Sequence, residues 1–417
     1  MSHFQIEGGR RLSGTLGVQG AKNSVLPILA AALLVPGECL IRNCPDLSDV
    51  TDTLEILKLL GCRVCREGDT VRVDAEGLKR DTIPGCLMRK MRSSVIFLGP
   101  LLARRGRACL SLPGGCELGP RPIDLHLSAL RTLGVEIGEE QGNICCRADG
   151  LRGREICLPI PSVGATENAM LCACGCEGVT TIVGAAREPE IVDLQNFLRA
   201  MGADVSGAGE SLLTVRGGRP LHGGEYTVMG DRIAAATYLC AAAAAGGEIT
   251  LTGVDPAHLS AVLRALEQAG CVLTEGDGRI GLRSCGSLHG VPPVRTAPYP
   301  GFPTDAQAIL MAALAGGRGC TMFVENMFES RYGHVDELRR MGADIQTSGR
   351  VAVVTGAGVL RGTQVRGCDL RCGAALVVAG LAARGRTCVG GLRHIRRGYE
   401  DLAGNLRLLG ADIREID

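Results

Sequence analysis

The chain has 417 residues, about twice the length of a typical single domain, so we expect two domains. Hydrophobic residues make up 46% and charged residues 21%, which is typical of a globular enzyme with a large core. The formal net charge is +1 without any block of like charges, which argues against nucleic acid or an anionic membrane surface as a partner.

The N-terminal segment MSHFQIEGGRRLSG (1–14) is polar and lacks the apolar centre of a signal peptide. The apolar run LPILAAALLV (26–35) is too short to span a bilayer and ends at Pro36-Gly37. We therefore expect a cytoplasmic protein.

Along the chain, one pattern occurs six times at intervals of about 70 residues, which indicates an internal repeat. Each copy predicts a helix closed by a glycine and followed by a short strand. The copies are LLGCRV (59–64), TLGVEI (132–137), AMGADV (200–205), QAGCVL (268–273), RMGADI (340–345) and LLGADI (408–413).

A second pattern alternates with the first, and in it an apolar helix ends at glycine and leads into a strand. Examples are AALLVPGECLIRN (31–43) and AAAAAGGEITLTG (241–253). Each repeat therefore holds at least two helices and several strands. Six repeats, taken three per domain, predict two similar α/β domains.

The 20 cysteines are too many for a single explanation, but the repeat accounts for several of them. Cys62 and Cys271 occupy a position where other copies have alanine, so we interpret them as small core residues. Cys62 and Cys65 form a C-x-x-C, which would also suit a redox pair or half of a zinc site. No second C-x-x-C with suitable spacing accompanies it, and a metal or redox protein is the less favoured alternative.

Most of the predicted starts of the six apolar helices are polar or charged residues. An arginine there faces the positive end of the helix dipole, which costs stability unless an anion binds. Unpaired N–H groups at helix starts favour phosphate or carboxylate ligands, so we expect a multiply anionic ligand where several helices converge. Simple helix capping remains open for Asn23. The starts are Lys22-Asn23, Arg92, Gly164, Arg232, Asp305 and Arg371.

Cys116 stands apart from the repeat, in the segment SLPGGCELGPRPIDLH (111–126). Glycines on both sides permit either a mobile lid or a tight hairpin with a buried cysteine. Arg121, Arg331 and Arg397 lie near predicted loops, where each taken alone also suits a surface residue. No P-loop, dinucleotide-binding glycine motif or H-E-x-x-H is present, so no cofactor and no metal is expected.

Several segments together resemble the UDP-N-acetylglucosamine enolpyruvyl transferases, in order from about residue 3 to residue 415. They are GAKNSVLPILAAALL (20–34), KMRSSVIFLGPLLAR (90–104), LPGGCELGPRPIDLH (112–126), PSVGATENAM (161–170), AAREPEIVDL (185–194), VRTAPYPGFPTDAQA (294–308), FESRYGHVDEL (328–338), DLRCGAALVVAGL (369–381) and HIRRGYEDL (394–402). The resemblance implies an inside-out α/β barrel of two domains, each with three βαβαββ units. One domain would comprise residues 22–229 and the other residues 1–21 and 230–417, with the active site in the cleft between them.

The resemblance also implies a reaction. Members transfer the enolpyruvyl group of phosphoenolpyruvate to the 3′-hydroxyl of UDP-N-acetylglucosamine and release phosphate, the first committed step of peptidoglycan synthesis. Asp305 would be the general base, and Cys116 the proton donor, which can also form an adduct with phosphoenolpyruvate. Lys22 and Arg397 would act with them in catalysis, and Lys22, Arg121 and Arg397 would hold phosphoenolpyruvate.

The substrate-binding positions implied in this way are spread over the whole chain. Two small-molecule substrates are the expected partners, and the protein is expected to be a monomer or a weak oligomer. The positions are Lys22, Asn23, Arg92, Arg121, Pro122, Ile123, Asp124, Leu125, Ser162, Val163, Gly164, Asp305, Met327, Arg331, Asp369, Arg371 and Arg397.

Ser330, Gly333 and Ile160 depart from the family pattern, which bears on nucleotide-sugar affinity and not on the reaction. Two alternative functions remain. One is the related transfer to shikimate 3-phosphate, for which a different N-terminal signature and no PGGC segment are expected. The other is a non-catalytic paralogue that binds a nucleotide sugar.

Overall fold

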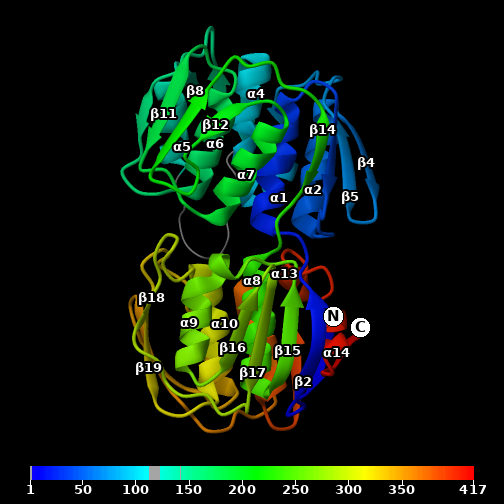
Figure 1. Ribbon diagram of the computed structural model, residues 1–417, viewed down its shortest axis with the longest axis vertical. Coiled ribbons are helices and arrows are strands. Elements are labelled where there is room, and N and C mark those ends of the chain that lie inside the picture. Colours follow the sequence, from blue (N-terminus) through cyan, green and yellow to red (C-terminus); the bar gives the residue numbers. More distant parts are fainter. Residues whose placement is uncertain (1, 112–122, 141) are drawn as a thin grey trace. The chain divides into compact units, whose positions relative to one another are not determined.

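The computed structural model describes residues 2–111, 123–140 and 142–417 (Figure 1). These residues separate into two compact units. The first unit contains residues 2–19 and 230–417, and the second contains residues 20–111, 123–140 and 142–229. Each unit has its own cluster of buried apolar side chains.

Each unit has three four-stranded sheets in the described part of the chain, and all six are built alike. One edge strand pairs in parallel with a second strand, which pairs antiparallel with a third, which pairs antiparallel with the fourth. The first unit has the sheets β22 (Gln364–Arg366), β23 (Arg386–Gly390), β1 (His3–Glu7) and β24 (Asp412–Ile416); β18 (Val294–Arg295), β19 (Cys320–Val324), β21 (Val351–Thr355) and β20 (Asp344–Ser348); and β2 (Leu12–Gly17), β15 (Gly247–Thr252), β17 (Arg279–Ser284) and β16 (Val272–Gly276).

The sheets of the second unit repeat this order of pairing, which confirms the six-fold repeat predicted from the sequence. They are β14 (Gly224–Thr227), β3 (Glu38–Arg42), β5 (Thr70–Asp74) and β4 (Arg63–Glu67); β6 (Thr82–Ile83), β7 (Arg107–Ser111), β9 (Asn143–Arg147) and β8 (Glu136–Glu140); and β10 (Glu155–Cys157), β11 (Val179–Val183), β13 (Leu212–Arg216) and β12 (Asp204–Ser206).

The interior of the first unit is made of helices. α8 (Arg232–Ala245), α10 (Thr304–Ala315) and α12 (Leu370–Ala382) pack against one another, and α8 and α10 lie side by side in Figure 1. Their side chains are apolar and buried on nearly every side, as expected for helices that sheets enclose. The remaining helices are η3 (Pro256–Leu259), α9 (Ser260–Gln268), α11 (Val335–Arg340), α13 (Leu392–Ile395) and α14 (Leu402–Leu408).

The second unit follows the same plan. α4 (Leu98–Arg105) packs against α6 (Val163–Ala173), and α1 (Lys22–Ala31) contacts η2 (Arg92–Phe97). The interior helices and surrounding sheets agree with the predicted inside-out α/β fold. The other helices are η1 (Ala32–Leu34), α2 (Ser48–Leu60), α3 (Gly85–Met88), α5 (Asp124–Thr132) and α7 (Pro189–Ala200).

The glycines of the first sequence pattern end their helices as predicted. Gly61, Gly134, Gly202, Gly270, Gly342 and Gly410 all have φ between +92° and +111°. This left-handed conformation is costly for any residue with a Cβ and is the usual end of a helix at glycine. The strand after each of them pairs at a sheet edge, so the glycine sets the direction in which that strand leaves.

The predicted helix starts are confirmed to within one residue. α1, α8 and η2 begin at Lys22, Arg232 and Arg92 themselves, while α10 and α12 begin one residue before Asp305 and Arg371. The second unit differs in one detail, because the chain from Arg92 first forms a 3₁₀ helix before α4.

The cysteines are mainly core residues. Burial raises the pKa of the Cys62 and Cys271 thiols to about 11, in agreement with their alanine-like position. Cys109 is joined to Cys145 by a disulfide across β7 and β9, where the two residues are in register. Within the described ranges, no helix has the length and apolar character needed to cross a membrane.

Candidate active site

Asp305 is the centre of a cluster of charged side chains in the first unit. It lies in the first turn of α10, where Arg331 donates to its Oδ1 at 2.5 Å and Arg371 donates to its Oδ2 at 2.8 Å. The Arg331 and Arg371 side chains are only 3% and 7% exposed, whereas Asp305 is 29% exposed. Two buried guanidinium groups therefore hold a carboxylate that still reaches solvent.

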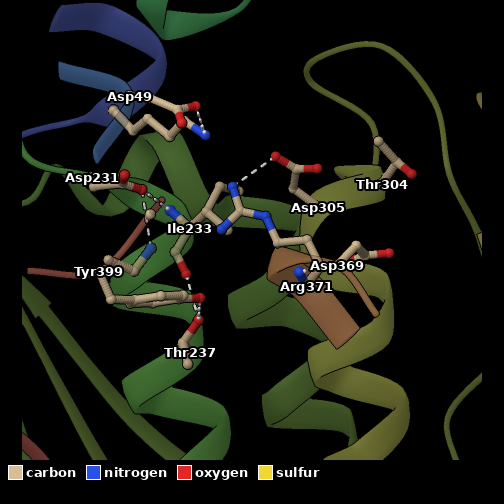
Figure 2. A network of polar contacts seen from close by, with 12 residues as sticks. Asp49, Asp231, Ile233, Thr237, Thr304, Asp305, Asp369, Arg371 and Tyr399 are labelled. Carbon is tan, nitrogen blue, oxygen red and sulfur yellow. Dashed lines mark hydrogen bonds and ion pairs between the residues drawn. The ribbon is translucent and has the colours of Figure 1, made fainter. Parts of the chain in front are cut away.

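Arg371 extends from the first turn of α12 toward α10 (Figure 2). Burial, the largest single effect, would lower its pKa, but the attraction of Asp305, Tyr399 and Asp231 together outweighs it, so the pKa is raised. Tyr399 contacts the same guanidinium, and its hydroxyl lies 2.6 Å from that of Thr237 on α8. Burial, the largest effect, raises the pKa of Tyr399, so this phenol stays a neutral hydrogen-bonding group.

Aspartates cap two of the interior helices. Asp369 Oδ1 accepts from the N–H groups of Arg371 and Cys372 at 2.7 and 2.9 Å. Asp231 Oδ1 accepts in the same way from the N–H groups of Ile233 and Ala234 at 2.8 and 3.0 Å (Figure 2). The caps fix the first turns of α12 and α8, and in α12 they orient Arg371.

Glu325 holds the start of α10 in place through hydrogen bonds. It was not identified in the sequence. Its buried carboxylate accepts from the Thr304 hydroxyl at 2.9 Å and from the Thr296 hydroxyl at 2.9 Å. It also accepts from the N–H of Met327 at 2.8 Å. One side chain thus positions both the helix turn that carries Asp305 and the segment that carries Met327, whose own side chain is exposed.

Two more basic residues of the first unit lie near helix ends. The Arg232 guanidinium, at the start of α8, lies 5.7 Å from the ring centre of Tyr299. Arg397 is half-buried in the turn after α13, where its backbone N–H donates to the carbonyl of His394 at 3.3 Å. Arg331 also lies 5.6 Å from the ring centre of Phe328.

In the second unit, Lys22 forms an ion pair with Asp49. Lys22 begins α1 and its Nζ lies 2.8 Å from Asp49 Oδ2, in the first turn of α2. Asp49 was not identified in the sequence, although its place in a first helical turn is a known preference of acidic residues. Asn23 next to it is exposed, and Ser24 donates to the buried carboxylate of Asp193 on α7.

The starts of α5 and α6 lie close together in the second unit. Ser162 caps α6 by accepting from the Ala165 N–H at 3.4 Å, and Val163 and Gly164 form the next positions of that turn. A Cβ on Gly164 would lie 2.8 Å from Cε1 of His126, which shows how closely α5 approaches. His126 was also not identified in the sequence, and its Nδ1 lies 3.0 Å from the Asn168 amide.

The remaining predicted positions are placed only in part. Asp124 is exposed at the first residue of α5, and Ile123 and Leu125 beside it are half-buried. Cys116, Arg121, Pro122 and the side chain of Arg92 lie outside the described residues.

Two of the three residues that depart from the family pattern lie beside the charged cluster in sequence and space. Ser330 and Gly333 line a cavity together with Asp369, whereas Ile160 is 61% exposed in the second unit. Among the residues that the structure describes, no group of three or more histidine, cysteine or acidic side chains is arranged to hold a metal ion.

Known proteins are similar to this chain over nearly its whole length. The family described as EPSP synthase (3-phosphoshikimate 1-carboxyvinyltransferase) matches residues 6–406. The chain is 49% identical to UDP-N-acetylglucosamine 1-carboxyvinyltransferase 2 of Caldanaerobacter subterraneus subsp. tengcongensis over 100% of both chains. It is 46% identical to UDP-N-acetylglucosamine 1-carboxyvinyltransferase 1 of Carboxydothermus hydrogenoformans, over 100% of this chain and 99% of the relative.

Solved structures are similar too. The enolpyruvyl transferase NikO of Streptomyces tendae has a TM-score of 0.89 at 28% identity, covering 99% of this chain and 98% of that one. An EPSP synthase of Acinetobacter baumannii has a TM-score of 0.77 at 20% identity over 100% of both chains, and this likeness concerns the fold alone.

Proposed function

Because the chain belongs to the enolpyruvyl transferase family, among the UDP-N-acetylglucosamine 1-carboxyvinyltransferases, we propose that it transfers the enolpyruvyl group of phosphoenolpyruvate to the 3′-hydroxyl of UDP-N-acetylglucosamine and releases phosphate. This reaction is the first committed step of peptidoglycan synthesis, and we place it in the cytoplasm. Residues 22–229 and residues 1–21 with 230–417 are the two proposed enolpyruvyl transferase domains.

The structural observation that supports the proposal most strongly is that two arginines form ion pairs with Asp305. A carboxylate held by Arg331 and Arg371 at the start of α10 is fixed in direction and remains partly exposed. Such a group is suited to accept a proton from a substrate hydroxyl, because its orientation needs no further ordering. Asp305 is therefore the proposed general base.

The reaction is an addition at C2 of phosphoenolpyruvate followed by elimination of phosphate. Addition requires a proton at C3 of the enolpyruvyl group, and Cys116 is the proposed donor, since an ordinary thiol is largely protonated near neutral pH. Lys22, Arg121 and Arg397 are proposed to bind the phosphate and carboxylate and to stabilise the charge that develops on them. Lys22 already faces one carboxylate, that of Asp49, which fixes its ammonium group at the start of α1.

Phosphate release from phosphoenolpyruvate, measured with each acceptor in turn, tests the proposal. We expect release with UDP-N-acetylglucosamine and none with shikimate 3-phosphate. Release only with shikimate 3-phosphate would assign the chain to the other transfer reaction. Binding of UDP-N-acetylglucosamine without any turnover would make it a non-catalytic binding protein.

A matched pair of variants tests the role of Asp305 within this assay. Asp305→Asn keeps the shape of the side chain but removes the base, and we expect kcat to fall by about 100-fold to 10,000-fold. Asp336→Asn removes an exposed carboxylate of α11 that pairs with Arg339, and it should leave kcat unchanged. Equal kcat values in the two variants would contradict the assignment of Asp305.

A further inference from the structure

Two cysteines stand on either side of the Asp369 cap of α12. Cys368 precedes the cap and Cys372 follows it by three residues, and the Cys372 thiol donates a hydrogen bond to the Cys368 sulfur. This hydrogen bond, followed by burial, raises the pKa of Cys372. Cys372 is therefore a protonated, buried partner for the sulfur of Cys368.

The two sulfurs differ in access. Cys372 is 1% exposed, whereas Cys368 is partly exposed and lines a cavity of about 340 Å³ together with Tyr332, Gly333 and Asp369. A Cβ on Gly333 would lie 2.9 Å from the Cys368 sulfur. The absence of a side chain at position 333 therefore leaves the Cys368 sulfur accessible from the cavity.

The position before the cap also favours a thiolate at Cys368. The start of α12 presents the positive end of a helix of 13 residues. A hydrogen bond donated to the sulfur stabilises its negative charge further, as in other reactive thiols at helix starts. The Asp369 carboxylate opposes this effect, but its Oδ1 is engaged by the N–H groups of Arg371 and Cys372.

We propose that Cys368 is a thiol-exchange site that reacts with low-molecular-weight disulfides entering the cavity, and that Cys372 resolves the adduct. The Cys368 thiolate attacks one sulfur of the disulfide RSSR, which forms a mixed disulfide and releases one thiolate RS⁻. Cys372 gives up its proton and attacks the Cys368 sulfur, which releases the second RS⁻. The two protein thiols are oxidised to one disulfide while RSSR is reduced to two thiols.

Other cysteines of the described chain lack one part of this arrangement. Cys172 and Cys176 also share a hydrogen bond, but both are fully buried in the core cluster of the second unit. Cys285 is exposed in the first unit, and its sulfur contacts the backbone carbonyl of Ser287. Cys285 therefore serves as an internal reference for a reactive surface thiol without the Cys368–Cys372 arrangement.

Peptide mapping of the whole protein by mass spectrometry tests this chemistry without any measurement of activity. The reduced protein is treated with glutathione disulfide and digested under acid conditions. In the unmodified chain we expect a Cys368–Cys372 disulfide, two hydrogens lighter than the dithiol, and a lasting glutathione adduct at Cys285. Cys372→Ser should retain glutathione at Cys368, and Cys368→Ser should leave Cys372 unmodified.

Three results would overturn the proposal. They are a lasting glutathione adduct at Cys368 in the unmodified chain, no reaction at Cys368, and modification of Cys372 in the Cys368→Ser variant. Because these readouts concern only the two thiols, they stand or fall independently of the proposed transferase reaction.

The variant Gly333→Ala tests the route of access. The added methyl group would meet the sulfur of Cys368, so modification of Cys368 should slow by about tenfold relative to Cys285 in the same sample. The control is the same measurement in urea, because Cys368 of Gly333→Ala and of the unmodified protein should react alike once both are unfolded. An unchanged ratio in the folded protein would overturn the role given to the cavity.

Discussion

Arg371 of α12 donates to Oδ2 of Asp305 on α10 at 2.8 Å, although the two residues are 66 positions apart in the chain. The contact joins the first turns of two interior helices and is only 7% exposed on the arginine side. A buried charge with a single dominant partner is sensitive to the shape of the donor as well as to its charge. The pair is therefore a direct test of how Asp305 is positioned.

Arg371→Lys keeps the positive charge but replaces the planar guanidinium by a compact ammonium group. We expect kcat for phosphate release to fall by about 100-fold, because the carboxylate of Asp305 is no longer oriented from α12. Arg283→Lys, at an exposed position of β17, is the control and should leave kcat unchanged. Similar kcat values for both variants would show that the Arg371 contact is structural only.

Cys116→Asp tests the proposed proton donor, which lies outside the described residues. A carboxylic acid also donates a proton, so we expect part of the activity to remain, with the optimum at lower pH because an aspartic acid loses its proton at lower pH than a thiol. The epoxide fosfomycin, which would alkylate the thiol, should no longer attach at this position. Undiminished labelling of the variant, read by peptide mass, would refute the assignment.

The sequence predicted the repeated part of the fold well, because each repeat carries its own local signals. A helical apolar pattern followed by glycine determines where a helix ends, and Gly61 and Gly410 end helices in the same left-handed conformation although they lie in different units. The predicted helix starts were correct for the same reason. The fold was thus predictable wherever neighbouring residues decide the local structure.

Contacts between distant residues were not predictable in this way. Asp305, Arg331 and Arg371 were each named, but their meeting depends on how α10, α12 and the loop before α11 pack. Glu325 and Asp49 carry no motif of their own and gain their roles only from such packing. The disulfide of Cys109 likewise depends on the register of β7 against β9.

Gly164→Ala tests the close approach of α5 and α6 in the second unit. Alanine favours the first turn of a helix by about 1 kcal/mol over glycine, but its Cβ would lie 2.8 Å from Cε1 of His126. We expect His126 to be displaced and the KM for UDP-N-acetylglucosamine to rise by about tenfold. The free energy of unfolding should decrease by about 1–2 kcal/mol because of the overpacking.

Gly138→Ala is a suitable control for this variant. Nothing lies within 4 Å of a Cβ at Gly138, on β8 of the same unit, so its KM should not change. If both variants bind UDP-N-acetylglucosamine as well as the unmodified protein, the first turn of α6 does not contribute to the nucleotide-sugar site.

His334 makes the stability of the first unit depend on pH. It is buried beside Met311, with its Nε2 3.2 Å from the sulfur. Burial lowers its pKa to about 4; the charge of Asp369 opposes this, the charge of Arg331 adds to it, and a backbone hydrogen bond with Arg331 opposes it. The His334 side chain takes up a proton near pH 6.5 in the unfolded chain but only near pH 4 in the folded chain. The free energy of unfolding is therefore highest above pH 6.5 and decreases as the pH falls toward 4.

The loss over this range amounts to about 3 kcal/mol, and urea unfolding followed by circular dichroism at pH 7.5, 6, 5 and 4.5 measures it. His334→Gln has no group that titrates there, so we expect its urea midpoint to fall less between pH 7.5 and 4.5, whatever its midpoint at pH 7.5. His289→Gln, at an exposed position, should keep the full pH dependence of the unmodified protein. An equally steep decline in the His334 variant would show that other groups cause the loss of stability in acid.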